Sequence, residues 1–283
     1  MFLLKNNQLQ VSVLDPVADR SRLGSRYCTG GYIWQIADLN LGNLLSGPQY
    51  PGPDPSRFDG QGVPEVFETA PGHDTCRLNE ELLVIGVGRV IRTSDIHPFH
   101  VRDNPCVSRF CDWEIRSGDS SVVMETCQSF KDFSLKLIRQ VILSNRTVIS
   151  KTTLLNNGSA SIPLRWFSHP FFPRTKELVC CSFSIPVTVP ENPGFYLDEH
   201  NCLCMRESYQ WSRGCYLPLE MEWGQKLSIN QFHDLVKSVR VTMDFPLAWM
   251  PVWANNATFS FEPYLDRIVE PGNDFQWQIE YGF

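Results

Sequence analysis

Two short segments of this chain each place one titratable side chain among aromatic residues. His169 lies within Trp-Phe-Ser-His-Pro-Phe-Phe, and Glu262 lies within Thr-Phe-Ser-Phe-Glu-Pro-Tyr. Each directly precedes a proline, which ends a strand because it lacks a backbone donor. A histidine and a carboxylate in apolar surroundings are the components of a proton-transfer site that works near neutral pH. If the ends of two distant strands converge, we expect both side chains to share one cleft.

Each residue alone also has an ordinary structural interpretation. His169 among aromatic side chains could be a packed histidine. Glu262 could be a solvated strand residue, because period-two alternation puts it on one face with Ser260, while Phe259 and Phe261 share the other face. The similar arrangement of the two segments, more than either residue alone, favours a catalytic interpretation.

The elements that must position these side chains are strands. Alternation of apolar and polar residues predicts strands from Phe133 to Leu143, from Thr147 to Leu155 and from Ile162 to Trp166. The Asn-Asn-Gly sequence at 156–158 is a hairpin signal, because Asn and Gly tolerate positive φ. We therefore expect an antiparallel meander of three strands that ends at His169.

Strand patterns continue downstream, from Val236 to Met243 and from Phe275 to Phe283, and no long amphipathic helix is evident. The predicted fold class is therefore all-β, a large antiparallel β-sandwich that forms a single domain over residues 1–283. Residues 47–62 and 94–104 are rich in Pro, Gly or His and are predicted to be long loops. Binding groups concentrate on loops of this kind.

Composition narrows the class of protein. The chain has 283 residues, 42% of them hydrophobic, and a net charge of −6. Without a Lys or Arg stripe, this balance argues against nucleic acid as a partner. No apolar run reaches the roughly 18 residues of a membrane span, and no secretory signal is visible, so we expect no membrane partner. We expect a cytoplasmic protein with reduced cysteines, whose spacing forms no paired zinc set.

Several motifs occur in the order found in aldose 1-epimerases, also called galactose mutarotases. The Ser-His-Pro-Phe-Phe segment at His169 resembles the His-Pro-Tyr-Phe type motif of that family, and Phe-Glu-Pro at Glu262 resembles its late Glu-Pro motif. Shorter matches lie at residues 62–67, 154–158 and 270–272. The resemblance implies the large antiparallel supersandwich of the galactose mutarotases, which agrees with the strand prediction.

The resemblance also implies a mechanism. Glu262 is expected to be the base that removes the proton of the anomeric hydroxyl of a cyclic aldose, and His169 the acid that protonates the ring oxygen. The ring opens, rotates about the C1–C2 bond and recloses as the other anomer. Acid and base are expected on opposite sides of one sugar ring. The implied partner is a small-molecule sugar, with no cofactor and no metal.

The resemblance also implies polar sugar-binding residues. For the second histidine of the family, His100 is the better match, because Trp113 follows at about the family distance, and His97 is the competitor. Asp198 is a plausible match for the family's aspartate, and Asp234 is the alternative.

The arginine and the stacking aromatic residues have several candidates each. No motif separates the three possible arginines, of which Arg92 is included in the predicted site, with Arg77 and Arg89 as alternatives. Aromatic faces that could stack on the C–H face of a sugar are those of Trp166, Phe171 and Trp253, although such residues also commonly belong to a core.

The predicted function is an isomerase that interconverts the anomers of an aldose. A non-catalytic carbohydrate-binding protein is one alternative, because fold does not determine function. A hexose-phosphate mutarotase or a polysaccharide lyase on the same fold is another; for the phosphosugar enzyme we expect an arginine cluster, and the only dense group is Arg20, Arg22 and Arg26. A two-carboxylate glycosidase would leave the histidine motif unused. Neither the sugar nor the oligomeric state is predicted.

Overall fold

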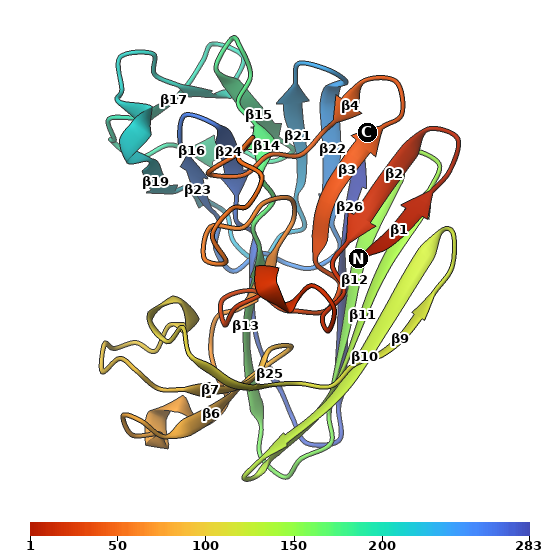
Figure 1. The fold of residues 1–283 in the computed structure, drawn as a ribbon. Coiled ribbons are helices and arrows are strands. Elements are labelled where there is room, and N and C mark those ends of the chain that lie inside the picture. The colour runs from red at the N-terminus through yellow and green to blue at the C-terminus, as the bar shows by residue number, and fades with distance from the viewer.

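The computed structural model describes residues 1–283 and consists mainly of antiparallel strands (Figure 1). Ten of them form the largest sheet: β9 (Glu114–Ser117), β10 (Ser121–Phe130), β11 (Phe133–Ser144), β12 (Thr147–Asn156), β15 (Val179–Phe183), β17 (Phe195–Leu197), β18 (Leu203–Met205), β21 (Ser228–His233), β22 (Lys237–Met243) and β26 (Asp274–Gly282). Their order is β17-β18-β15-β21-β22-β26-β12-β11-β10-β9. The predicted all-β antiparallel fold is confirmed.

Five smaller sheets complete the fold. They contain β1 (Phe2–Lys5), β2 (Leu9–Val13), β3 (Ile33–Asp38) and β4 (Gly42–Asn43); β5 (Glu65–Phe67), β13 (Ile162–Ser168) and β25 (Tyr264–Val269); β14 (Phe172–Pro173), β19 (Cys215–Pro218), β23 (Pro251–Ala254) and β24 (Thr258–Phe261); β6 (Glu81–Val84), β7 (Gly88–Ile91) and β8 (Val107–Phe110); and β16 (Val187–Thr188) with β20 (Glu220–Met221). Short 3₁₀ turns are η1 (Arg20–Arg22), η2 (His73–Thr75), η3 (Val101–Asp103) and η4 (Trp211–Arg213). None of the helical segments has the length and apolar character needed to cross a membrane.

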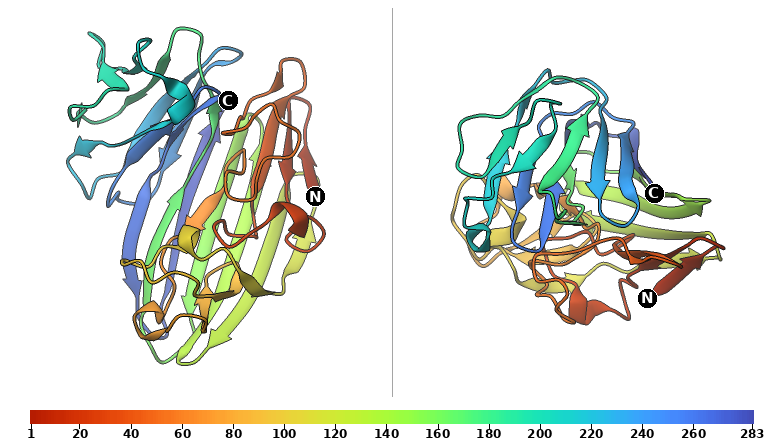
Figure 2. Two further views of the ribbon diagram at one scale, coloured as in Figure 1. Left: turned by 60° about the vertical axis from the view of Figure 1, so that its left-hand side comes forward. Right: turned by 90° about the horizontal axis from the view of Figure 1, so that it is seen from above.

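The core lies between the long sheet and the smaller sheets. Strand β11 shows why, since Leu135, Leu137, Val141 and Leu143 alternate with less buried residues and all point inward. Each such side chain contributes roughly 1.5–3 kcal/mol on full burial. These residues belong to a cluster of 51 buried residues that also includes residues of the N-terminal sheet. That sheet packs across β10 and β11, as the views in Figure 2 show.

The structure corrects the predicted meander. Strands β11 and β12 pair as expected, with Ser144 opposite Thr147. The third strand, β13, does not return to β12, whose other neighbour is β26. Instead β13 joins a separate sheet between β25 and β5. The side chain of Asn156 donates to the carbonyl oxygens of Ala160 and Val269, so this loop changes sheets and closes no hairpin.

The sheet β25-β13-β5 has one face on the core and the other on a cavity. Trp166 points into the core and lies 5.4 Å from Trp277, measured between ring centroids. Ser168, on the same face, hydrogen-bonds to Tyr281 within the core. Phe167 and the following odd-numbered residue, His169, line the cavity. Strict alternation along β13 therefore decides which side chains can meet a ligand.

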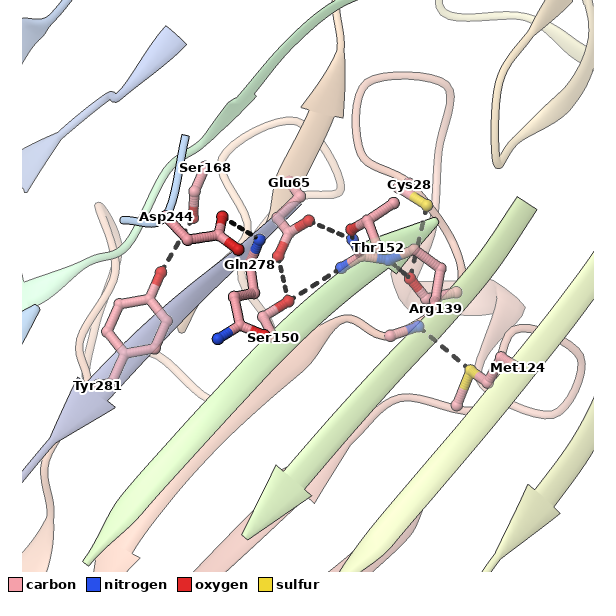
Figure 3. A network of polar contacts seen from close by, with 12 residues as sticks. Cys28, Glu65, Met124, Arg139, Ser150, Thr152, Ser168, Asp244, Gln278 and Tyr281 are labelled. Atoms are coloured by element: carbon pink, nitrogen blue, oxygen red, sulfur yellow. Dashed lines mark hydrogen bonds and ion pairs between the residues drawn. The ribbon is translucent and has the colours of Figure 1, made fainter. Parts of the chain in front are cut away.

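The core face of this sheet carries a buried ion pair (Figure 3). Glu65 Oε2 lies 2.5 Å from Arg139 Nη1, and the two side chains are 3% and 1% exposed. The guanidinium also donates to Ser150 Oγ, Thr152 Oγ1 and the carbonyl oxygen of Gly30. Ser150 in turn donates to Glu65 Oε1 at 2.5 Å. The pair thus ties β5 to β11 and β12 through an ion pair and hydroxyl hydrogen bonds.

Both predicted long loops border the same cavity. Residues 47–62 contain no strand, and residues 94–104 contain only η3. The first loop contributes Pro48, Phe58 and Asp59 to the cavity wall, and the second contributes His100 and Arg102. The site is therefore assembled from strand ends on one side and loops on the other.

Candidate active site

A cavity of about 530 Å³ collects side chains from distant parts of the chain. Its volume lies in the range of small-molecule sites. Seven of its fifteen lining residues are aromatic: Phe58, Phe167, Phe171, Tyr216, Trp249, Trp253 and Tyr264. Flat aromatic faces combined with a few polar groups are suited to a ligand with both C–H faces and hydroxyls, as a sugar has.

Two strand ends bring His169 and Glu262 into this cavity. Phe259 and Phe261 of β24 are buried in the core, so Ser260 and Glu262 face the cavity side. The backbone N–H of His169 donates to Pro64 at 2.8 Å, which continues the pairing of β13 with the segment before β5. The predicted convergence of the two segments is what the structure shows.

The two side chains contact each other directly. His169 Nε2 lies 3.3 Å from Glu262 Oε1, and His169 Nδ1 lies 2.7 Å from Ser260 Oγ. His169 is 4% exposed and Glu262 is 6% exposed. Ser260 holds Nδ1 of the imidazole, so Nε2 points toward the carboxyl group of Glu262. This is the arrangement of an oriented proton-transfer pair.

Burial shifts the pKa values of Glu262 and His169 in opposite directions. It raises the pKa of Glu262 to about 8, against the opposing positive charge of Arg26, and the negative charge of Glu68 adds to the rise. It lowers the pKa of His169 well below its usual value, and Arg26 lowers it further. Both shifts favour uncharged groups, so near neutral pH the pair holds one proton between the two side chains.

A second carboxyl group, Glu68, lies on the cavity wall just after β5. His100 Nε2 lies 2.6 Å from Glu68 Oε1, and Arg165 Nε lies 3.1 Å from Oε2. The hydroxyl of Tyr264 donates to Oε1 at 3.2 Å. Burial raises the pKa of Glu68, but the hydrogen bond and charge of His100, the charge of Arg165 and the bond from Tyr264 together lower it below its ordinary value. Glu68 is therefore an ionised carboxylate.

His100 reaches the cavity wall, as the resemblance implied, but its ring is already occupied by protein groups. Its Nδ1 accepts a hydrogen bond from the backbone N–H of Arg102 at 3.3 Å, and its Nε2 faces Glu68. The competitor, His97, lies against Arg92 and does not line the cavity. The geometry thus makes His100 a support for Glu68, with neither ring nitrogen free for a sugar.

The structure places Arg92 outside the cavity wall. Its guanidinium donates to the carbonyl oxygens of His73, Cys76 and Ser94. These contacts stabilise the loops around β7, and they leave Arg92 only 5% exposed. The arginines that line the cavity are Arg26, a member of the dense group seen in the sequence, and Arg102, which no sequence feature marks.

Asp198 also lies away from the cavity. Its carboxylate accepts hydrogen bonds from the backbone N–H groups of His200 and Cys202, so it stabilises the turn between β17 and β18. The alternative, Asp234, accepts from the backbone N–H of Lys176 and does not line the cavity either. The predicted aspartate contact to the sugar is therefore not supported by the geometry.

Of the three predicted aromatic contacts, Phe171 and Trp253 line the cavity and Trp166 does not. Trp166 is 1% exposed and packs edge-on against Phe245 and Trp277. The reason is the alternation of β13, which turns Trp166 to the face opposite His169. This alternation can be read from the sequence, which already places Trp166 on one face with Ile162 and Leu164.

Comparisons with known proteins agree with this fold. No protein-family model and no curated protein sequence matches the chain. Among solved structures, a galactose mutarotase-related enzyme from Lactobacillus acidophilus superposes with a TM-score of 0.63 at 13% identity, covering 99% of this chain and 96% of that one. A putative aldose 1-epimerase from Escherichia coli K12 gives 0.57 at 13% identity, with 99% and 97% covered. An aldose epimerase homologue from C. elegans gives 0.52 at 12% identity, with 99% and 97% covered. The chain has the galactose mutarotase-like fold.

Proposed function

We propose that this chain is a mutarotase that interconverts the α and β anomers of an aldose by acid–base ring opening and closure. The observation that supports it most is the Glu262–His169 pair, in contact at 3.3 Å on the wall of an aromatic cavity. A galactose mutarotase-like fold and solved neighbours named as mutarotase or epimerase relatives add support. We further propose a cytoplasmic location, which ten unpaired cysteines support.

Ring opening needs one proton accepted and one proton donated. Transfer of the shared proton to His169 yields a Glu262 carboxylate and an imidazolium. The carboxylate accepts the proton of the anomeric hydroxyl, the imidazolium donates its proton to the ring oxygen, and the bond between the anomeric carbon and the ring oxygen breaks to give the open aldehyde. The pair still holds one proton after this step, so rotation about C1–C2 and the reverse transfers complete the reaction.

The contact between the two groups changes the expected placement of acid and base. The resemblance implies that they flank a sugar ring from opposite sides. Here they are neighbours, with 3.3 Å between Nε2 and Oε1. The anomeric hydroxyl and the ring oxygen are bonded to the same carbon, so adjacent acid and base groups can serve both. Trp253, half-buried in the cavity wall with its ring centroid 6.4 Å from that of His169, offers an aromatic surface for the sugar beside them.

Polarimetry tests this proposal directly. Freshly dissolved α-D-glucose and α-D-galactose are followed by optical rotation with the purified protein, with Glu262→Gln and with His169→Asn. We expect faster mutarotation with the unaltered chain and loss of the acceleration in both variants. The control is Glu199→Gln, which alters an exposed glutamate paired with His200 at 3.6 Å. If neither sugar is accelerated while both bind, a non-catalytic carbohydrate-binding protein replaces the proposal.

A hexose-phosphate mutarotase is the second candidate, because two arginines line the cavity. Arg26 and Arg102 are both in its wall, whereas Arg20 and Arg22 are not. An arginine pair is well suited to a phosphate group. Adding hexose 6-phosphates to the same polarimetric assay separates the two: a rate well above that of the free hexoses would favour the phosphosugar.

A further inference from the structure

The cavity contains two clusters in which a carboxyl group accompanies aromatic rings. We name Glu262, His169, Phe171 and Trp253 the anomeric subsite. The distal cluster consists of Glu68, Tyr264, Trp249 and Tyr216. Within it, the ring centroids of Trp249 and Tyr264 are 4.8 Å apart, and those of Trp249 and Tyr216 are 6.3 Å apart. The proposed proton transfer uses only the first cluster, so the second has no role in it.

The two clusters lie at different heights along β13. The backbone N–H of Glu68 donates to the carbonyl oxygen of Arg165, whereas that of His169 donates to Pro64. Their backbones are therefore four residues apart along one strand, which corresponds to roughly 13 Å at about 3.3 Å per residue. The rings of Phe167 and Tyr264, stacked at 4.4 Å, cover the sheet between these positions. Tyr216 is the register partner of Trp253, so the distal cluster directly adjoins the anomeric subsite on one cavity wall, as sites for successive sugar units must.

Glu68 has acceptor capacity that the protein does not use. Its Oε1 takes the contacts of His100 and Tyr264, while Oε2 faces only Arg165. An ionised carboxylate offers about four lone-pair sites, so Oε2 can accept from further donors. No group of three or more His, Cys, Asp or Glu side chains surrounds it that could hold a metal ion. The donors that fit an ionised carboxylate beside aromatic faces are sugar hydroxyls.

We propose that the distal cluster is a second sugar subsite, and that the substrate is a reducing oligosaccharide of two or more units whose reducing end occupies the anomeric subsite. This inference rests on the proposed function and names its substrate class. Glu68 binds hydroxyls of the penultimate unit, and Trp249 and Tyr216 stack on it. Tyr216 is 50% exposed, which leaves the distal end open to a longer chain. His100 is a positioning residue that holds Glu68.

Equilibrium binding of sugars that cannot react tests the subsite apart from turnover. Methyl β-D-glucoside is compared by calorimetry with methyl β-maltoside, methyl β-cellobioside and methyl β-lactoside. A hydrogen bond to a charged group contributes about 1.5–3 kcal/mol, so we expect at least one disaccharide glycoside to bind about tenfold to a hundredfold more tightly. Equal affinity for the monosaccharide and all three disaccharides would overturn the proposal.

Variants then assign the preference to residues. Glu68→Gln keeps the shape and removes the charge, and we expect the ratio of disaccharide to monosaccharide affinity to fall toward one. Trp249 is a half-buried residue of the cavity wall, and Trp249→Ala should lower the same ratio. This variant tests the subsite if Glu68→Gln does not fold. Glu199→Gln should leave the ratio intact. A preference that survives in both cavity variants places the second sugar elsewhere and refutes the subsite.

Turnover distinguishes failure of this inference from failure of the proposed function. In polarimetry with α-lactose and with α-D-glucose, Glu68→Gln should raise KM for the disaccharide about tenfold or more with a smaller change in kcat. A fall in kcat without a change in KM would contradict a binding role. If no reducing sugar is accelerated but disaccharide glycosides bind preferentially, the distal subsite stands and the mutarotase proposal fails. A strong preference for hexose phosphates over the disaccharides would refute an oligosaccharide as the substrate.

Discussion

Two buried acid–base pairs lie on opposite faces of the same small sheet, and they differ in almost every physical respect. Glu65 and Arg139 point into the core, and Glu262 and His169 meet in the cavity. The two pairs are neighbours, because Glu65 is the register partner of Ser168, the residue before His169. The core pair is drawn in Figure 3 with the serine and threonine that surround it.

The difference lies in what else each pair contacts. Arg139 has three further hydrogen-bond partners, and its guanidinium stays charged at any ordinary pH. The pair therefore has one charge state and one geometry. Ser260, which contacts His169, is the only other close polar partner of the reactive pair. Burial keeps His169 uncharged near neutral pH and raises the pKa of Glu262 to about 8, so one proton can move between the two groups. A buried pair with a permanent charge and several further partners is structural, and a buried pair with a mobile proton and one further partner is reactive.

The largest expected effect is on the reaction rate when the reactive pair is broken. In Glu262→Gln or His169→Asn, one of the two proton-transfer groups is missing. General acid–base catalysis contributes about 10²–10⁴-fold, so we expect the polarimetric rate to fall by that factor. The circular dichroism spectrum should match that of the unaltered protein. A fall of less than threefold in both variants would mean that the pair is structural, like its neighbour.

Breaking the structural pair should act on stability. Arg139→Met leaves the carboxylate of Glu65 buried without its cation, and such losses cost about 3–5 kcal/mol in the free energy of unfolding. Urea denaturation measures the change. The matched control is Arg116→Met, which removes an exposed ion pair with Glu125 and should cost less than about 1 kcal/mol. Equal effects of the two variants would contradict the claim that burial makes the core pair important.

The sequence predicted the scaffold of both pairs better than their partners. Alternation over β11, β12 and β26 marks long strands clearly, because each buries one continuous face. Alternation does not say which strand pairs with which, so it predicts β13 beside β12, whereas the neighbours of β13 are β25 and β5. Partner choice depends on contacts between residues far apart in the chain.

The site residues were predicted where a local signal existed. Glu262 and His169 stand in distinctive segments, and alternation sets their faces. Glu68 follows a strand of three residues, Glu65–Phe67, which is too short to show a period. Arg26 reaches the cavity from a loop, where its guanidinium is held over Phe58 at 4.3 Å. The sequence marks Arg26 as one of three clustered arginines, but it does not indicate that Arg26 or Glu68 reaches the cavity, because tertiary packing alone produces those contacts.

The next effect is about tenfold and concerns pH. The reactive pair works while it holds one proton, and Glu262, with a pKa of about 8, loses it as the pH rises. We expect kcat/KM to reach a plateau near neutral pH and to fall about tenfold for each pH unit well above 8. Circular dichroism at the same pH values checks that the fold persists. A rate that stays level up to pH 10 would show that this proton is not used.

The smallest effects come from the two serines that support the pairs, and they separate the two kinds of pair most finely. Ser260→Ala removes the partner of His169 Nδ1, so the imidazole is less well oriented toward Glu262. A neutral hydrogen bond contributes about 0.5–1.5 kcal/mol, which predicts a loss of about twofold to tenfold in kcat with little change in stability.

Ser150→Ala is the matched change on the core pair, since Ser150 bridges Glu65 and Arg139 and lies buried in the same way as Ser260. Leaving a charged group there partly unsatisfied should cost about 1–3 kcal/mol in the free energy of unfolding, with no change in kcat. Each serine should therefore affect the measurement that the other leaves alone. If both variants change stability and neither changes kcat, then orientation of His169 does not limit the rate, and the reactive pair depends on its two titratable groups alone.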